Sequence, residues 1–124
     1  MPYFDYRTPD ELSADIERLG VDVELRDDMA PLAASIRIGG HELSNRLAVH
    51  PMEGCDGNLD GTPGELTFRR WRRFAEGGAA LLWGEATAIE PEGRANPRQL
   101  VISRATAAEL KRLLGETRAT RTAR

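Results

Sequence analysis

The chain of 124 residues has little cysteine and no long apolar run. Its single cysteine, Cys55, excludes an internal disulfide, and such sparse cysteine is typical of a reducing compartment. No apolar run is long enough to span a bilayer. Residues 1–7 lack the basic and apolar regions of a signal peptide. These absences predict a cytoplasmic protein that does not contact a membrane.

An excess of positive charge is also missing. The sequence has 17 Lys and Arg against 20 Asp and Glu, a net charge of −3, which argues against a nucleic-acid partner. An apolar content of 40% with 30% charged residues is typical of a folded globular protein. The length allows one domain at most. A closed eight-stranded α/β barrel needs about 250 residues, so a complete barrel is excluded.

Residues 1–34 are expected to form a helical lead-in. Residues 8–11, Thr-Pro-Asp-Glu, form a capping box with proline at the first helical position. Gly20 supplies a stop signal. Between them, apolar residues recur on one helix face: Leu12, Ile16 and Leu19.

Residues 35–124 are expected to alternate strands and helices. Two alternating runs on either side of residues 39–40, Gly-Gly, predict a β-hairpin. An apolar strand is predicted at 47–50, and the nearly continuous apolar run at 79–89 is typical of a strand covered on both faces of a parallel sheet. Two parallel strands with a right-handed crossover cannot bury both faces, so the pattern predicts part of a larger sheet.

A helix is predicted between these two strands. Residues 62–65, Thr-Pro-Gly-Glu, form a second capping box before it. Its apolar residues fall on one face at the helical period: Phe68, Trp71, Phe74 and Ala75. Its arginines are expected to form a solvated face: Arg69, Arg70, Arg72 and Arg73.

A third helix is predicted after a polar loop at 90–98. Ser103 or Thr106 can cap it, and Gly115 is expected to weaken it because glycine costs roughly 1 kcal/mol against alanine inside a helix. Its predicted core stripe consists of Leu110, Leu113 and Leu114.

Two metal sites were considered. Residues 56–61 match the first half of a calcium-binding loop, but the twelfth position is Thr67 and not an acid, and the loop follows a strand. His50, Cys55 and Asp56 could form a corner of a zinc site, which would need further carboxylates or another chain. We therefore predict no metal site, and nothing in the sequence supports Cys55 as a nucleophile.

Five segments carry a resemblance to a known family. Residues 36–46, Ile-Arg-Ile-Gly-Gly-His-Glu-Leu-Ser-Asn-Arg, resemble the opening of the Old Yellow Enzyme family of FMN-dependent NAD(P)H:flavin oxidoreductases. His-Pro-Met-Glu at 50–53 resembles the Ala-Pro-Met-Thr or Ala-Pro-Met-Cys that ends the family's first barrel strand. Three further segments match family motifs in the same order and spacing: Asp-Gly-Thr-Pro at 60–63, residues 75–88, and Pro-Glu-Gly-Arg at 91–94.

The resemblance implies an α/β fold. It implies the N-terminal part of a (β/α)8 TIM barrel with a bottom-capping β-hairpin and a leading helix, too short for a complete barrel. Residues 35–124 would hold the hairpin and the first two β/α units. The implied activity is hydride transfer from NAD(P)H through FMN to an activated alkene or enone, a small-molecule substrate. The alternative is a non-enzymatic, truncated barrel piece that needs a complementing chain or a second copy.

The resemblance also implies roles for four residues. Pro51, Met52 and Glu53 stand where the family's first strand meets the flavin, and Ala86 stands where the backbone of the second strand approaches the isoalloxazine ring. Glu53 departs from the family's Thr or Cys, because an ionised carboxylate only accepts hydrogen bonds. We expect Glu53 to be turned away, protonated, or part of a different tuning of the flavin.

The resemblance assigns no catalytic residue to this chain. The family's flavin-binding Gln, its substrate-anchoring His/Asn or His/His pair, its proton-donating Tyr and its phosphate-binding loops lie beyond Arg124 in family order. Gln99 follows the second strand and does not take over the role of that Gln. The chain is therefore expected to be a fragment that is inactive alone.

Overall fold

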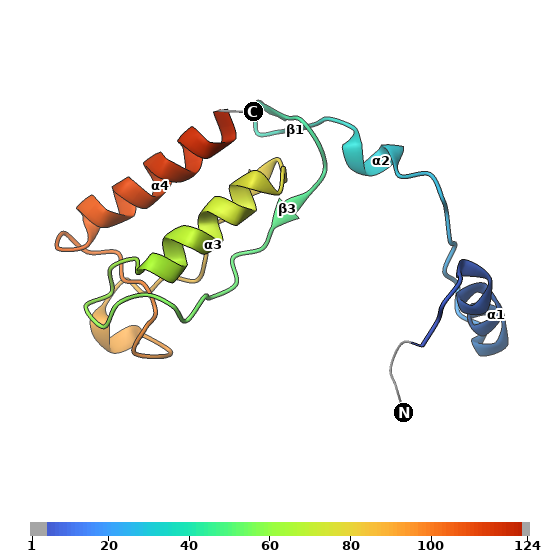
Figure 1. Cartoon of the computed structure of the whole chain (residues 1–124), viewed down its shortest axis with the longest axis horizontal. Coiled ribbons are helices and arrows are strands. Elements are labelled where there is room, and N and C mark those ends of the chain that lie inside the picture. Colours follow the sequence, from blue (N-terminus) through green and yellow to red (C-terminus); the bar gives the residue numbers. More distant parts are fainter. Residues whose placement is uncertain (1–4, 123–124) are drawn as a thin grey trace. The chain divides into compact units, whose positions relative to one another are not determined.

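The computed structural model describes residues 5–122. The chain divides into two units, Met1–Pro31 and Leu32–Arg124, which are described separately (Figure 1). The division falls close to the boundary after residue 34 that the sequence suggested. The assignment of these segments as a lead-in and a barrel portion stays a prediction. No helix within residues 5–122 is long and apolar enough to cross a bilayer.

The first unit holds helix α1, Pro9–Leu19, at the predicted place. The Thr8 hydroxyl accepts a hydrogen bond from the Glu11 backbone N–H at 3.3 Å, and the Glu11 carboxylate accepts one from the Arg7 N–H at 2.7 Å. Gly20, at φ 63°, ends the helix in the left-handed region that glycine tolerates. Because no residue of Pro9–Leu19 is buried, capping contributes more than packing to holding this helix.

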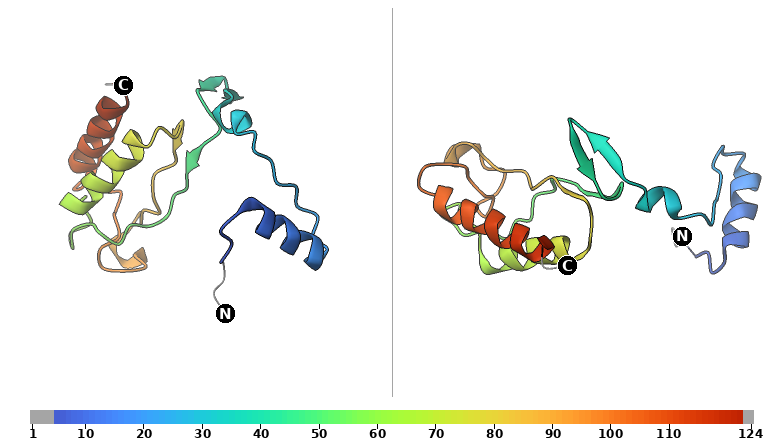
Figure 2. Two further views of the ribbon diagram at one scale, coloured as in Figure 1. Left: turned by 45° about the vertical axis from the view of Figure 1, so that its right-hand side comes forward. Right: turned by 90° about the horizontal axis from the view of Figure 1, so that it is seen from above.

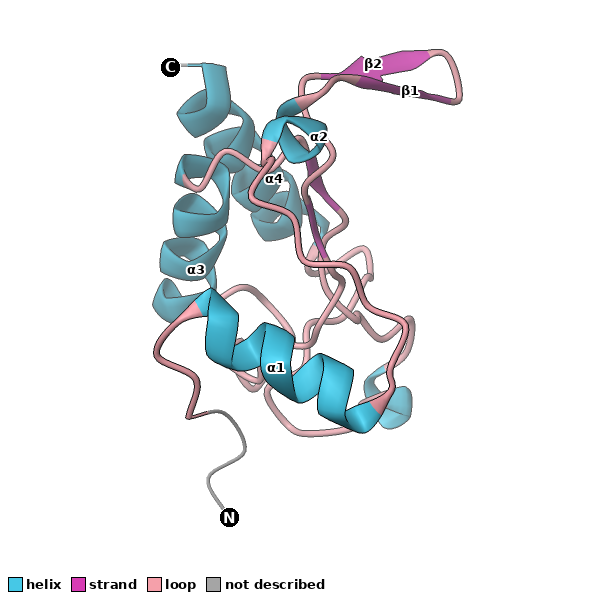
Figure 3. Cartoon of the chain, turned by 90° about the vertical axis from the view of Figure 1, so that its right-hand side faces the viewer, coloured by secondary structure: helices cyan, strands magenta, loops and turns pink. Residues whose placement is uncertain are grey.

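The second unit begins with short elements. Helix α2, Ala30–Ala33, spans the boundary, and strands β1, Ile36–Ile38, and β2, His41–Leu43, form an antiparallel hairpin (Figure 3). The two-residue turn uses Gly39 and Gly40 at φ 55° and 85°, the pair of positive angles that a type I′ turn needs. The predicted hairpin is confirmed.

The two predicted strands pair in parallel, which confirms the crossover topology. Strand β3, Ala48–Val49, lies beside β4, Leu81–Leu82, with Ala48 opposite Leu81 and Val49 opposite Leu82. The Trp83 N–H extends the pairing by donating to the Val49 carbonyl at 3.1 Å. Helix α3, Glu65–Glu76, connects the two strands.

Within the described residues the apolar run at 79–89 is not covered on both faces, as expected for two strands that cannot bury both of their faces. Regular strand is confined to Leu81–Leu82, and the side chains of Trp83 and Ile89 are exposed. The reason is that, within residues 5–122, the β3–β4 sheet has two strands and no third strand to extend it. The apolar run is therefore suited to a larger sheet than these residues form.

The chain after β4 forms a loop and then comes back to pair with residue 88. It passes through the 3-10 helix η1, Pro91–Gly93, and then Val101 forms a parallel bridge with Ala88. The Val101 N–H donates to the Gly61 carbonyl at 3.0 Å. Gly61 has φ 84°, and a Cβ there would lie 2.7 Å from a Val101 methyl, so this close approach requires glycine.

The core lies between the sheet and two helices. Helix α4, Ala107–Thr122, packs beside α3, as the separate views show (Figures 1 and 2). Leu113 is 1% exposed, whereas Leu114 is 44% exposed, so the predicted stripe of α4 is correct at Leu113 and wrong at Leu114. The buried apolar residues are Trp71, Ala75, Ala80, Ala88, Leu100, Val101 and Leu113.

Helix α4 continues past Gly115 to Thr122, although the glycine was expected to weaken it. Arg112 pairs with Glu109 at 2.7 Å and with Glu116 at 3.3 Å, and the second of these ion pairs spans the glycine. The Thr117 hydroxyl donates to the Leu113 carbonyl at 2.7 Å. Local contacts thus offset the glycine penalty.

The start of α3 also differs from the prediction. The helix begins after Gly64, whose N–H donates to the Thr67 hydroxyl at 3.2 Å, and not at a Thr62 cap. The Thr62 hydroxyl is engaged elsewhere, donating to Asp60 at 2.6 Å and accepting from Asn58 at 2.9 Å. The same motif therefore builds the preceding loop.

Adjacent leucines of α4 provide a test of the core. We expect Leu113→Ala to lower the free energy of unfolding by about 2–5 kcal/mol, because it leaves a cavity between α3 and α4. The matched control, Leu114→Ala, should cost less because that side chain is partly in solvent. Urea unfolding followed by circular dichroism measures both, and equal losses would contradict this assignment of the core.

Candidate functional site

The parallel pairing of β3 and β4 brings two of the predicted segments together. Both strands end at the same edge of the sheet, and beyond them the Ala86 N–H donates to the Pro51 carbonyl at 3.0 Å. In α/β barrels this carboxyl edge is where active sites form. The structure therefore places residues 51–53 and Ala86 side by side, as the sequence predicted.

This edge is open to solvent. Met52 is 77% exposed, Pro51 and Ala86 are exposed, and Glu53 is half-buried. An apolar hollow of about 360 Å³ lies on the sheet next to it. Its lining consists of Ala48, Val49, His50, Pro51, Leu81 and Trp83.

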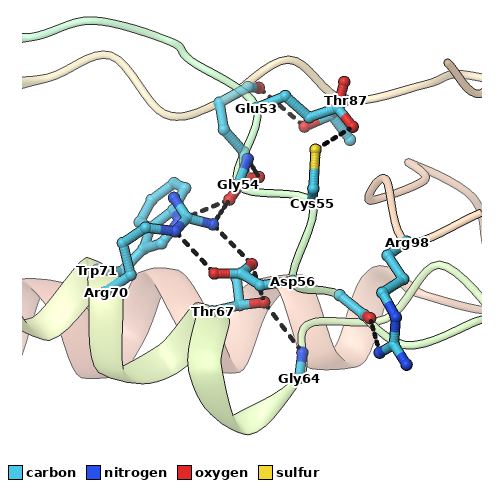
Figure 4. Close-up of polar contacts among 12 residues, drawn as sticks. Glu53, Gly54, Cys55, Asp56, Gly64, Thr67, Arg70, Trp71, Thr87 and Arg98 are labelled. Carbon is cyan, nitrogen blue, oxygen red and sulfur yellow. Dashed lines mark hydrogen bonds and ion pairs between the residues drawn. The ribbon is translucent and has the colours of Figure 1, made fainter. Parts of the chain in front are cut away.

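Glu53 does not point an unpaired carboxylate outward. Its Oε1 accepts a hydrogen bond from the Asn96 side-chain amide. It accepts another from the Cys55 thiol at 3.4 Å (Figure 4). Of the arrangements that the sequence left open, the structure thus shows a Glu53 that is bound to the loop following β4. The hydrogen bond to Glu53 also raises the pKa of the Cys55 thiol, which disfavours its thiolate form.

A buried carboxylate, Glu85, joins the two strand ends to α3. Its side chain is 2% exposed and accepts three hydrogen bonds. The donors are the Gly54 N–H at 3.1 Å, Arg70 Nη2 at 2.8 Å and Trp71 Nε1 at 2.8 Å. Glu85 is the only charged residue in the run 79–89, a signal that could have identified it from the sequence.

Arg70 binds a second carboxylate, that of Asp56. Its Nε and Nη2 donate to the two Asp56 oxygens at 2.9 and 2.8 Å, and the Thr67 hydroxyl donates to the same carboxylate at 2.8 Å (Figure 4). Arg70 lowers the pKa of Asp56 below its usual value, and Asp56 in turn raises the pKa of Arg70. The prediction that Arg70 lies on a solvated face is wrong, since its side chain is 22% exposed.

The two aspartates considered as metal ligands accept hydrogen bonds from protein donors. Asp56 pairs with Arg70, and Asp60 accepts from the Thr62 N–H and hydroxyl at 2.9 and 2.6 Å. Within residues 5–122, no group of three His, Cys, Asp or Glu side chains is arranged to hold a metal ion.

Gln99 lies after the second strand, as the sequence indicated, but its contacts were not predicted. It is 7% exposed, and its side-chain amide donates to the Ala86 carbonyl at 3.3 Å and accepts from the Ala95 N–H at 2.7 Å. It thus lies directly behind one of the predicted site residues. Gln99 directly follows the polar loop at 90–98, and no sequence pattern distinguished it from the other polar residues there.

The fold of the chain is similar to that of several solved structures, among them Old Yellow Enzymes. An Old Yellow Enzyme from a Pichia species matches with a TM-score of 0.66 and 22% identity over 73% of this chain. The Old Yellow Enzyme from Trypanosoma cruzi matches with a TM-score of 0.62 and 20% identity over 73%. A 2-naphthoyl-CoA reductase matches with a TM-score of 0.68 and 19% identity over 73%. The Old Yellow Enzyme-like resemblance is confirmed for the fold.

The matched structures are much longer than this chain, which covers 24% of each of the two Old Yellow Enzymes and 14% of the reductase. No protein-family model and no curated protein sequence matches the chain. The likeness therefore concerns a small α/β piece without a closed sheet, and leaves activity to be proposed.

Removing the charge of Glu85 should destabilise the unit. We expect Glu85→Gln to lower the free energy of unfolding by about 3 kcal/mol, because the amide leaves Arg70 and the other donors without a full acceptor set. The control Glu90→Gln changes an exposed side chain and should stay within about 0.5 kcal/mol of the wild type. Urea unfolding compares them, and a similar loss in both variants would refute the role of this network.

Acid should weaken the Asp56–Arg70 pair. Since the folded-state pKa of Asp56 is lowered, its stabilising contribution is present above the unfolded value of about 3.9 and is lost as pH falls through the folded value. The stability gap between the wild type and Asp56→Asn should therefore be constant between about pH 7 and 5 and shrink below about pH 4. Urea midpoints across this range test it, and a gap that widens in acid would count against the pair.

Proposed function

We propose that the chain supplies the flavin-contacting corner of an FMN-dependent NAD(P)H oxidoreductase of the Old Yellow Enzyme type, as the N-terminal part of its TIM barrel. The observation that carries this proposal is the hydrogen bond from the Ala86 N–H to the Pro51 carbonyl at 3.0 Å. It joins the two segments that match the family's flavin-contacting motifs. The similarity in fold supports the proposal.

The chemistry of this edge suits a flat, largely apolar ring. Pro51, Met52 and Ala86 are exposed, and the adjacent apolar hollow of about 360 Å³ lies within the range of small-molecule sites. In the proposed enzyme FMN would accept a hydride from NAD(P)H and pass it to an activated alkene or enone. Pro51, Met52, Glu53 and Ala86 would hold the ring and exclude water from it.

Each residue would act through position and not through proton transfer. The paired backbones of Pro51 and Ala86 fix the distance between the two strand ends. Asn96 holds the Glu53 carboxylate on the side of the loop, which limits the repulsion between that charge and an electron-rich reduced flavin. No described residue is proposed as a catalytic acid or base. NAD(P)H and the small-molecule substrate would be held by barrel segments that this chain does not cover.

A second candidate is a non-enzymatic barrel piece that is completed by another chain or a second copy. The observation that favours it is apolar exposure along the sheet and its edge. The exposed side chains are Leu47, Met52, Trp83 and Ile102. A partner that supplied neighbouring strands would bury them and pair the open edges of β3 and β4. A cytoplasmic location stays a prediction under either candidate.

Titration of the ¹⁵N-labelled chain with FMN tests the proposal. We expect weak binding, with chemical-shift changes concentrated at residues 51–54 and 84–88, because these backbones would face the ring. Inorganic phosphate is the control for binding of the phosphate group alone. We also expect no NADPH oxidation, since no catalytic residue is assigned to this chain.

Shifts confined to other surfaces, or no response to millimolar FMN by a folded chain, would reject the flavin-contacting role. NADPH turnover by the chain alone would contradict its expected inactivity. Concentration-dependent dimerisation in sedimentation velocity, together with loss of Trp83 exposure, would support the second candidate.

A further inference from the structure

We propose that Asn96 and Gln99 are positioning residues that clamp the two strand ends, at Glu53 and Ala86, in the orientation that the flavin requires. The inference rests on the proposed function for the identity of the ligand. The clamp itself follows from contacts in the loop after β4, independently of any bound group.

The peptide groups on both sides of Ala86 are hydrogen-bonded, one to Gln99 and the other to Pro51. The Ala86 carbonyl accepts from Gln99 Nε2 at 3.3 Å, while the Ala86 N–H donates to Pro51. Because its N–H and its carbonyl are both hydrogen-bonded, the backbone of Ala86 is held in one orientation at the strand end. The other end of the Gln99 amide accepts from the Ala95 N–H at 2.7 Å, so the side chain uses a donor and an acceptor at once.

Asn96 makes the corresponding contact with the other strand end. Its Nδ2 donates to the Glu53 carboxylate, and its Oδ1 accepts from the Arg98 N–H at 2.8 Å. The Asn96 carbonyl accepts from the Gln99 N–H at 3.1 Å, so a single turn carries both contacts. The distance between Glu53 and Ala86 is therefore set by this turn as well as by the sheet.

The turn is itself anchored and is suited to be a support. The Arg98 carbonyl accepts from the Gly57 N–H at 3.0 Å, and the Arg98 side chain donates to the Gly57 carbonyl at 3.2 Å (Figure 4). Arg94 Nη1 donates to the Leu59 carbonyl at 2.8 Å. Leu100 follows directly and is buried. These contacts transmit the position of the core to the strand ends.

Two substitutions of Gln99 can distinguish its hydrogen bonding from its contribution to packing. A leucine at position 99 would occupy a similar volume but could not donate to Ala86. A glutamate could donate only when protonated, because an ionised carboxylate has no hydrogen to give. Replacing Gln99 by these two residues therefore distinguishes a hydrogen-bonding clamp from a packed side chain.

Hydrogen exchange on the ¹⁵N-labelled chain tests the clamp. In Gln99→Leu we expect the Ala86 amide to exchange about three- to tenfold faster, corresponding to one lost hydrogen bond, and its FMN-induced shift to disappear. In Gln99→Glu, exchange normalised to the wild type at each pH should approach the wild-type rate in acid and rise above it near neutrality. Arg104→Gln, an exposed change, is the control and should match the wild type.

The outcomes separate the clamp from the proposed function. If the wild type responds to FMN and Gln99→Leu keeps both normal Ala86 exchange and the FMN response, the clamp is overturned while the flavin role stands. A pH-independent effect of Gln99→Glu would also overturn it, in favour of packing. If the wild type shows no FMN response, the proposed function fails, and with it the ligand that the clamp would serve.

Discussion

The arrangement of the second unit depends on one guanidinium shared by two carboxylates. Arg70 lies between Asp56, in the loop after β3, and Glu85, at the end of β4, with its nitrogens 2.8–2.9 Å from their oxygens. Since two negative charges would repel at this distance, the strand ends can approach only while Arg70 is between them. The short two-residue strands contribute few ladder hydrogen bonds, so this ionic contact holds an edge that the sheet alone would not.

The same contact explains how polar groups are tolerated near the core. Glu85 has three donors and Asp56 has donors from Arg70 and Thr67, and within residues 5–122 no buried side-chain nitrogen or oxygen lacks a partner. A buried charge is acceptable when it is fully paired and is costly when a partner is lost. The ion pairs of Arg70 thus hold the two strand ends against α3, and the turn at residues 96–99 holds them through Glu53 and Ala86.

The sequence predicted elements whose signals are local. The α1 cap and the Gly39-Gly40 turn were identified because capping and turn chemistry depend on neighbouring residues. The parallel pairing of the two apolar segments was identified because the order strand, helix, strand requires a crossover between parallel strands. The contacts of Arg70 and Gln99 were misjudged or missed because their side-chain partners lie 4 to 15 residues away and depend on how the loops fold. Thr62 was misjudged because its hydroxyl binds Asp60 and Asn58 in the preceding loop. The open sheet was also expected, because the apolar run at 79–89 is typical of a larger sheet and the described residues supply two strands of it.

Position 54 requires a glycine because any side chain there would disturb the ion pairs of Arg70. A Cβ at this position would lie 1.9 Å from Arg70 Nη2, an atom held by both carboxylates and unable to yield without releasing one of them. Even a methyl group here would displace Arg70 from its carboxylates and would therefore have an effect similar to that of removing a charge. Substitutions at positions 54 and 70 are therefore expected to be strongly non-additive, and neither position can diverge without constraining the other.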